Sequence, residues 1–123
     1  MSERLPKHLD DALHAARLAL RFLADRSLSE YCGDDMLRSA VERQVEVVGE
    51  ACRRALGDTP ALRDHLPECV LAIAMRNRIT HGYDTVDHGI VYETVATRFP
   101  PLIEGLQRAL EQFQRNAQPK GAG

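Results

Sequence analysis

The amino-acid sequence predicts an all-α fold, an antiparallel up-and-down bundle of four to five helices. Apolar residues recur at three- and four-residue steps along most of the chain, which is the helical period. Glycine and proline clusters divide these stripes into separate segments, and neither strand patterns nor internal repeats are present. The chain has 123 residues, of which 44% are hydrophobic and 28% charged, so it suffices for one domain with a single core.

The first two helices are predicted over residues 4–26 and 34–56. Leu5, Leu9 and Leu13 begin the apolar stripe of the first. Asp34 and Asp35 suit the N-terminal cap of the second, and the Gly-Asp-Thr-Pro sequence that follows it ends it. Gly49 lies in its middle, where glycine costs about 1 kcal/mol relative to alanine. We therefore expect a neighbouring helix to approach the backbone closely there.

The second half of the chain is predicted to begin with a short helical piece over residues 61–65. A third long helix follows over 67–81, and because it is apolar over much of its circumference it should be central. Asp87 suits the cap of another short helix, and Pro100 and Pro101 are expected to interrupt it. A last helix is predicted over 102–115.

Composition places limits on the function. The net charge of −2 provides no overall basic field for nucleic acid. Arginine supplies every basic residue except two, which suits phosphate recognition, although a high-GC coding bias gives the same usage. Three cysteines without a metal spacing, a charged N-terminus and no membrane-length apolar run predict a cytoplasmic protein. We expect one domain over residues 1–115 and a disordered tail over 116–123.

The segment AMRNRITHGYDTV gathers the groups best suited to chemistry on phosphate. Arg76 offers a bidentate cation, His81 a group that passes protons near neutral pH, and Tyr83 a hydroxyl that binds or is itself modified. On a helix Asn77 and His81 share a face, but Arg76 and His81 lie roughly 140° apart. Either the helix unwinds near Gly82 or a second copy of the chain supplies the missing group, and we favour the second copy, with some help from unwinding.

Two readings of this segment remain open from the residues alone. Two copies of Arg76 and His81 around a two-fold axis would supply a base, an acid and a cation for RNA cleavage without any metal or other cofactor. Asn77 would then hold His81 in one tautomer or bind phosphate. In the alternative reading, Arg76 and Arg78 are solvated helix residues, and His81 caps the helix C-terminus.

Other candidate sites are weaker. His65 and Cys69 have the spacing of zinc ligands, but no second pair completes a site. Asp84, Asp87 and His88 are candidate metal ligands, although capping and solvent exposure explain them better.

Glu50 belongs to the polar flank of the second helix, beside its apolar stripe. The flank consists of Glu42, Arg43, Glu46, Glu50, Arg53 and Arg54. Glu50 either remains solvated with the others or contacts the helix that carries the Arg-His segment.

At these residues the chain resembles the HepT-like toxins of the HEPN superfamily. The signature of that family is Arg, four residues, His, one residue and Tyr, and it is matched by Arg76, His81 and Tyr83. AVERQVEVVGEACRRAL resembles the family's second helix, and VDHGIVYETVATRFPPLIEGL resembles the region after the motif. Together the similar blocks span about residues 35–110. The chain departs from the family in having Tyr92 where relatives often carry Trp, which indicates altered packing around an intact motif.

The resemblance implies a dimeric helical bundle with both motifs at the interface. It implies that the chain is the toxin of a type VII HepT/MntA toxin–antitoxin system and a metal-independent endoribonuclease. The expected substrate is RNA, and neither DNA nor a membrane is an expected partner. Arg76 and His81 would be catalytic, with Asn77, Arg78 and Glu50 in support. An MntA-like nucleotidyltransferase antitoxin would transfer AMP from ATP to a tyrosine, here Tyr83, and the added anionic groups would repel RNA.

Two non-catalytic hypotheses compete with this one. The chain is either a nucleotide- or RNA-binding partner subunit of a minimal nucleotidyltransferase, or purely a structural partner that positions that enzyme.

Overall fold

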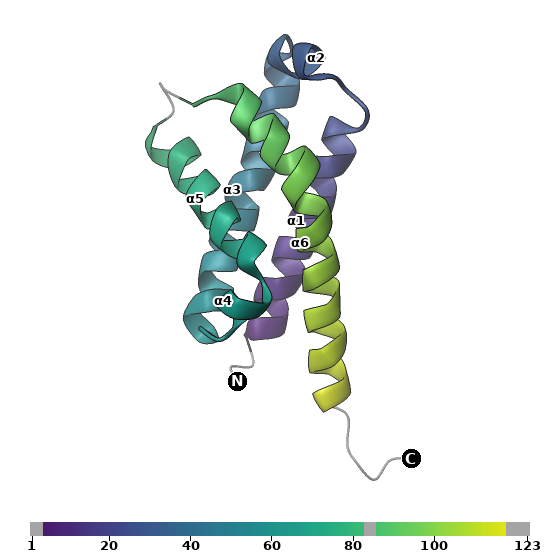
Figure 1. Ribbon diagram of the computed structural model, residues 1–123, viewed down its shortest axis with the longest axis vertical. Helices are drawn as coiled ribbons and strands as arrows, with labels where there is room; N and C mark the ends of the chain where they lie inside the picture. The colour runs from purple at the N-terminus through teal and green to yellow at the C-terminus, as the bar shows by residue number, and fades with distance from the viewer. Residues whose placement is uncertain (1–3, 83–85, 118–123) are drawn as a thin grey trace.

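The computed structural model describes residues 4–82 and 86–117, which contain six α-helices and no strand. The helices are α1 (Leu5–Leu23), α2 (Leu28–Cys32), α3 (Asp35–Asp58), α4 (Leu62–His65), α5 (Pro67–His81) and α6 (His88–Ala117). Figure 1 shows α1, α3 and α6 running along the length of the bundle, with α5 beside α3. The all-α prediction is confirmed, and two of the six helices, α2 and α4, are single short turns.

Helix α2 is unexpected, because it lies between the predicted helices over residues 4–26 and 34–56, where the sequence predicts no helix. Its start is specified locally by a capping box. The backbone amide of Glu30 donates to the Ser27 hydroxyl at 3.1 Å, and the Ser27 amide donates to the Glu30 carboxylate at 2.9 Å.

The predicted interruption at Pro100 and Pro101 is wrong, since α6 is one continuous helix of 30 residues (Figure 1). Two prolines inside a helix remove two backbone donors, and each costs about 3 kcal/mol in a helix interior. The apolar stripe, however, continues through both prolines, which are themselves exposed. The residues of this stripe are fully buried: Val91, Val95, Phe99, Leu102 and Leu106. Burial along the whole stripe outweighs the local loss.

The centre of the bundle is made by α1 and α3. Helix α1 packs on both α3 and α6, and α5 packs chiefly on α3. Helix α1 contributes four fully buried alanines to these contacts, Ala12, Ala15, Ala16 and Ala19, whose small side chains permit close packing.

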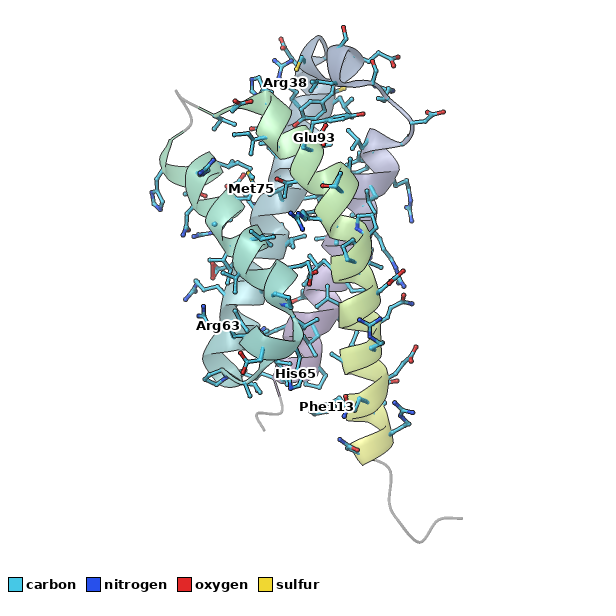
Figure 2. The ribbon with its side chains drawn as sticks, in the orientation of Figure 1. Arg38, Arg63, His65, Met75, Glu93 and Phe113 are labelled. Carbon is cyan, nitrogen blue, oxygen red and sulfur yellow. The ribbon has the colours of Figure 1, made fainter. Side chains whose placement is uncertain are left out.

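Helix α5 is not central, contrary to expectation. One face of it is buried against α3, and Met75 on this face is labelled in Figure 2. The opposite side is open: Leu71 is 44% exposed and Ala74 is also exposed. Its apolar circumference therefore exceeds what a single chain covers. Within the described residues, no helix is long and apolar enough to cross a membrane.

Candidate functional site

Close packing of α3 on α5 at Gly49 builds the site. A Cβ atom placed on Gly49 would lie 2.3 Å from the Cβ of Arg76 and 2.9 Å from the carbonyl oxygen of Ala72. Real Cβ atoms do not approach so closely, so only glycine permits this crossing. The expectation of a close backbone approach at Gly49 is confirmed. The partner is α5 of the same chain, at the residue that begins the Arg-His motif.

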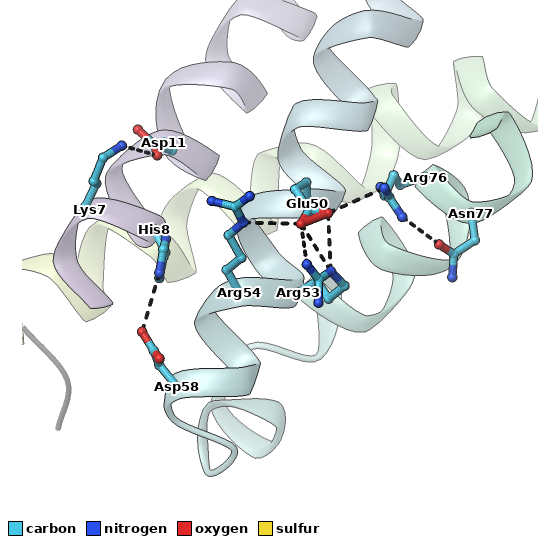
Figure 3. A network of polar contacts seen from close by, with 9 residues as sticks. All are labelled: Lys7, His8, Asp11, Glu50, Arg53, Arg54, Asp58, Arg76 and Asn77. Atoms are coloured by element: carbon cyan, nitrogen blue, oxygen red, sulfur yellow. Dashed lines mark hydrogen bonds and ion pairs between the residues drawn. The ribbon is translucent and has the colours of Figure 1, made fainter. Parts of the chain in front are cut away.

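The next residue, Glu50, is the centre of an arginine cluster drawn in Figure 3. Its Oε2 lies 3.5 Å from Nη2 of Arg76, so of the two readings of Glu50 the structure shows the contact with the motif helix. Arg53 approaches the same carboxylate with Nη2 at 2.5 Å and Nε at 3.2 Å, and Nε of Arg54 lies at 3.2 Å. Three guanidinium cations thus share one carboxylate, which leaves two positive charges in excess.

These arginines fix the charge of Glu50. The hydrogen bond from Arg53 is the main cause that lowers the pKa of Glu50 to about 2, with further contributions from the Arg54 hydrogen bond and the Arg53 and Arg76 charges. Partial desolvation opposes the shift. Glu50 is therefore ionised at neutral pH and holds Arg76, whose side chain is only 26% exposed, in a defined position.

The side chain of Asn77 is hydrogen-bonded to Arg76 and not to His81 in this structure. Its Oδ1 accepts a hydrogen bond from Nη1 of Arg76 at 3.2 Å. No hydrogen bond joins Asn77 to His81 in the part of the chain that the structure describes. Arg76 is therefore oriented from two sides, by a carboxylate on α3 and by an amide on its own helix.

His81 is exposed and is the last residue of α5. The helix does not unwind before it, because the amide of Gly82 still donates to the carbonyl of Arg78 at 2.9 Å. Arg76 and His81 consequently keep the roughly 140° separation of a regular helix. Unwinding before Gly82 thus does not bring the two groups together, while Tyr83 lies outside the described residues.

Arg78 is exposed and faces away from the Glu50 cluster, beside a separate hollow of about 310 Å³. The other residues of this hollow are Met75, Gly82, Val86, Asp87, Ile90 and Val91. The structure therefore does not bring Arg78 to Arg76 and Glu50.

A groove of about 420 Å³ adjoins the cluster between α1 and α3. Arg76, Arg54 and Glu50 line one part of it, and His8 and His14 of α1 line another. The sequence did not predict that α1 residues line this groove, because only tertiary packing brings α1 beside α3 and Arg76. Arg53 and Arg54 were also treated as a solvated flank, although their positions three and four residues after Glu50 were a usable signal.

The alternative metal sites find no support in the described residues. Within residues 4–82 and 86–117, no group of three or more His, Cys, Asp or Glu side chains could hold a metal ion. The Asp87 carboxylate accepts from the backbone amides of Gly89 and Ile90 at 2.9 and 3.2 Å, so it caps α6. His65 lies exposed at one end of the bundle (Figure 2), and Asp84 lies outside the described residues.

Tyr92, which stands where the similar family often has Trp, has a packing role. Its ring contacts that of Tyr31 with centroids 5.6 Å apart, and its hydroxyl donates to the carbonyl of Arg26 at 2.6 Å. Tyr31 is fully buried, which raises the pKa of its phenol, and its hydroxyl has no hydrogen-bond partner among the described residues.

Comparison with known proteins places the chain in a family. The model of the family described as "Ribonuclease HepT-like" matches residues 12–109. A protein of Methanocaldococcus jannaschii named "gamma-glutamylcyclotransferase and putative RNase" is 26% identical over 113 residues, which cover 92% of this chain and 50% of that protein. This chain thus spans half the length of that relative.

Two shorter relatives are covered more completely. A "putative RNase" of Methanocaldococcus jannaschii is 27% identical over 77% of this chain and 81% of its own length. A "probable ribonuclease HepT" of Thermococcus cleftensis is 28% identical over 77% of this chain and 86% of its own length. No solved structure matches the chain. The family match covers most of the chain and includes the whole arginine cluster and the Arg-His motif, and the chain therefore belongs to the ribonuclease HepT-like family.

Proposed function

We propose that the chain is a metal-independent endoribonuclease and the toxin of a HepT/MntA-type toxin–antitoxin pair. The observation that carries the proposal is the placement of Arg76, which Gly49, Glu50 and Asn77 hold in position five residues before an exposed His81. This segment lies inside the matched family region, and relatives over that region are named as putative or probable ribonucleases.

The chemistry requires groups of the kinds that Arg76 and His81 provide. One imidazole removes the proton from a ribose 2′-hydroxyl, whose oxygen then attacks the adjacent phosphorus. The bond from phosphorus to the 5′-oxygen breaks, and a second, protonated imidazole gives its proton to that oxygen. The guanidinium of Arg76 stabilises the negative charge that develops on the phosphoryl oxygens. The products are a 2′,3′-cyclic phosphate and a 5′-hydroxyl.

We propose that a second copy of the chain completes this site. One chain holds Arg76 and His81 on different sides of a regular helix, and the Arg-His motif of one chain contains a single imidazole where the reaction uses two. The motif helix also leaves an apolar side uncovered, at Leu71 and Ala74. Packing of two α5 helices through this side would bury it and would bring both motifs to one interface.

The first experiment is incubation of the purified protein with total cellular RNA in excess EDTA, beside the His81→Ala variant. We expect cleavage by the wild type alone, with 2′,3′-cyclic phosphate ends. His81 is exposed, so the variant should keep the fold, which circular dichroism checks. Equal cleavage by both proteins would show that His81 is not catalytic.

Regulation by modification of Tyr83 is a separate part of the proposal. Tyr83 follows His81 by two residues, so AMP groups attached to its hydroxyl would place negative charge at the RNA site. With an MntA-like nucleotidyltransferase and ATP present, mass spectrometry should find AMP on Tyr83 and cleavage should stop. AMP on Tyr92 instead, or none at all, would contradict this.

The second candidate function is a non-catalytic nucleotide- or RNA-binding subunit of a nucleotidyltransferase. The ion pair of Arg76 with Glu50 favours it, because it neutralises part of the charge that the reaction would use. Purified, unmodified protein that binds RNA but leaves it uncut over hours would support this function against the first.

A further inference from the structure

We propose that Arg53 and Arg54 of α3, together with Arg76 of α5, form a binding site for consecutive phosphates of a single RNA strand. The site would hold the strand beside the reaction centre. This inference rests on the proposed ribonuclease function, since it identifies how the substrate of that same site is gripped.

The cluster is held together by one carboxylate. Arg53 and Arg54 follow Glu50 by three and four residues, so both side chains reach it along the surface of α3. Arg76 reaches it from α5. The three cations repel one another, and Glu50 offsets this repulsion while it fixes their positions. Figure 3 shows the three guanidinium groups around this carboxylate.

The cluster keeps donors available for a ligand. The side chains of Arg53 and Arg54 are 57% and 59% exposed, against 26% for Arg76. Arg54 uses only Nε toward Glu50, and its two terminal nitrogens make no hydrogen bond to any described residue. A guanidinium with such nitrogens can bond two oxygens of one phosphate.

The charge of the cluster also points to an anionic ligand. Exposed ion pairs contribute only about 0–1 kcal/mol to stability, so folding gives little reason to gather three arginines around one acid. Two other acids line the adjoining groove, and both have partners: Asp11 pairs with Lys7 at 2.8 Å, and Glu46 accepts from Thr80 at 3.4 Å. The arginine cluster is thus a local positive site on a chain with a net charge of −2.

Consecutive phosphates of a single strand fit this arrangement better than an isolated anion. The three arginines come from two helices, and Glu50 already occupies the point where their guanidinium groups meet, so an isolated anion would have to compete with that carboxylate. The groove of about 420 Å³ continues from Arg54 and Arg76 along α1 and α3. A backbone with one charge at every nucleotide can follow such a surface while bases remain free of it.

The test measures binding of a fluorescent single-stranded RNA at several salt concentrations, with all proteins in the His81→Ala background to prevent cleavage. The variant is Arg53→Gln with Arg54→Gln. The matched control is Arg98→Gln with Arg108→Gln, which removes the same charge from exposed positions of α6 away from the groove. Loss of two phosphate contacts should reduce the slope of log K against log salt by about 1.4, that is about 0.7 for each contact.

The result that overturns the inference is a slope and affinity for the cluster variant equal to those of the α6 control. Arg54→Gln alone keeps the test decisive if the double variant unfolds, because Arg54 makes a single contact, and it should change the slope by about 0.7. Replacement of both residues with lysine should restore most of the slope, since it retains the charges.

The inference and the proposed function fail separately. If the wild type cuts RNA, Arg53→Gln with Arg54→Gln in a protein that keeps His81 should raise KM and change kcat little. An unchanged KM would refute the binding site and leave the ribonuclease proposal intact. If the wild type never cuts RNA but the slope falls as expected, the ribonuclease proposal fails and the phosphate site is supported.

Discussion

Gly49→Ala tests the claim that the contact between α3 and α5 positions Arg76. The added Cβ would lie 2.3 Å from the Cβ of Arg76, about 1 Å inside ordinary contact, and 2.9 Å from the backbone oxygen of Ala72. Neither atom is the end of a flexible side chain, so α5 must move away by about 1 Å. A displacement of this size at a reacting group costs about 100-fold in rate.

The stability change should be much smaller than the loss of activity. Overpacking costs about 1–3 kcal/mol, while replacement of a mid-helix glycine by alanine returns about 1 kcal/mol. We therefore expect the free energy of unfolding to fall by about 0–2 kcal/mol, and urea denaturation measures it. RNA cleavage by the folded variant gives the change in kcat/KM.

Gly57→Ala is the matched control, because it lies on the same helix with nothing within 4 Å of its added Cβ. It should keep full activity and gain up to about 1 kcal/mol from helix propensity. If Gly49→Ala behaved in the same way, the contact at Gly49 would not determine where Arg76 lies, and the account of the site would be wrong.

Three further predictions follow from other parts of the structure. The lowered pKa of Glu50 means that its carboxylate stabilises the fold above about pH 4.5 and that this contribution is lost as the pH falls toward 2. Urea midpoints of Glu50→Gln should therefore depend less on pH in that range than those of the wild type, and parallel curves would contradict the ion cluster. Tyr31→Phe removes a buried hydroxyl that lacks a described partner, so the free energy of unfolding should stay level or rise, and a loss above about 1 kcal/mol would reveal a partner. Leu71→Glu should leave the monomer folded, since Leu71 is 44% exposed, but should shift any dimer toward monomers in sedimentation and reduce cleavage. An unchanged dimer would exclude this side of α5 as its interface.

The sequence predicted the elements whose signals are local. Apolar content placed the third long helix over residues 67–81, where α5 lies. The Asp34–Asp35 cap and the Gly-Asp-Thr-Pro stop placed α3 to within two residues at each end. The capping box of Ser27 and Glu30 is an equally local signal, and it begins a helix between the two predicted helices. The interruption predicted at Pro100 and Pro101 was wrong because the rule for proline considers only the backbone donors lost locally. Whether α6 continues through them depends on its burial against the rest of the bundle, which is not a local signal.

In the candidate site, too, spacing along the chain predicted some features, and helix packing decided the others. Glu50 was expected either to be solvated or to contact the motif helix, and the packing of α3 on α5 decides for the contact. Asn77 was placed beside His81 by helical spacing, but its amide bonds Arg76, the preceding residue. The α1 side of the groove depends on how residues of two separate helices pack together, and no spacing along the chain specifies that.

Gly49 and Glu50 act on Arg76 in different but dependent ways. Gly49 sets how closely the two helices approach, and the 3.5 Å contact between Glu50 and Arg76 exists only at that approach. If the helices moved apart by about 1 Å, Arg76 would lose its carboxylate partner, while Arg53 and Arg54, which lie on α3 with Glu50, would keep theirs. The structure thus separates a part of the cluster that depends on helix packing from a part that does not. A change at position 49 should impair the reaction while RNA binding by Arg53 and Arg54 largely persists. A change at those two arginines should weaken RNA binding and leave the rate of the reaction largely unchanged.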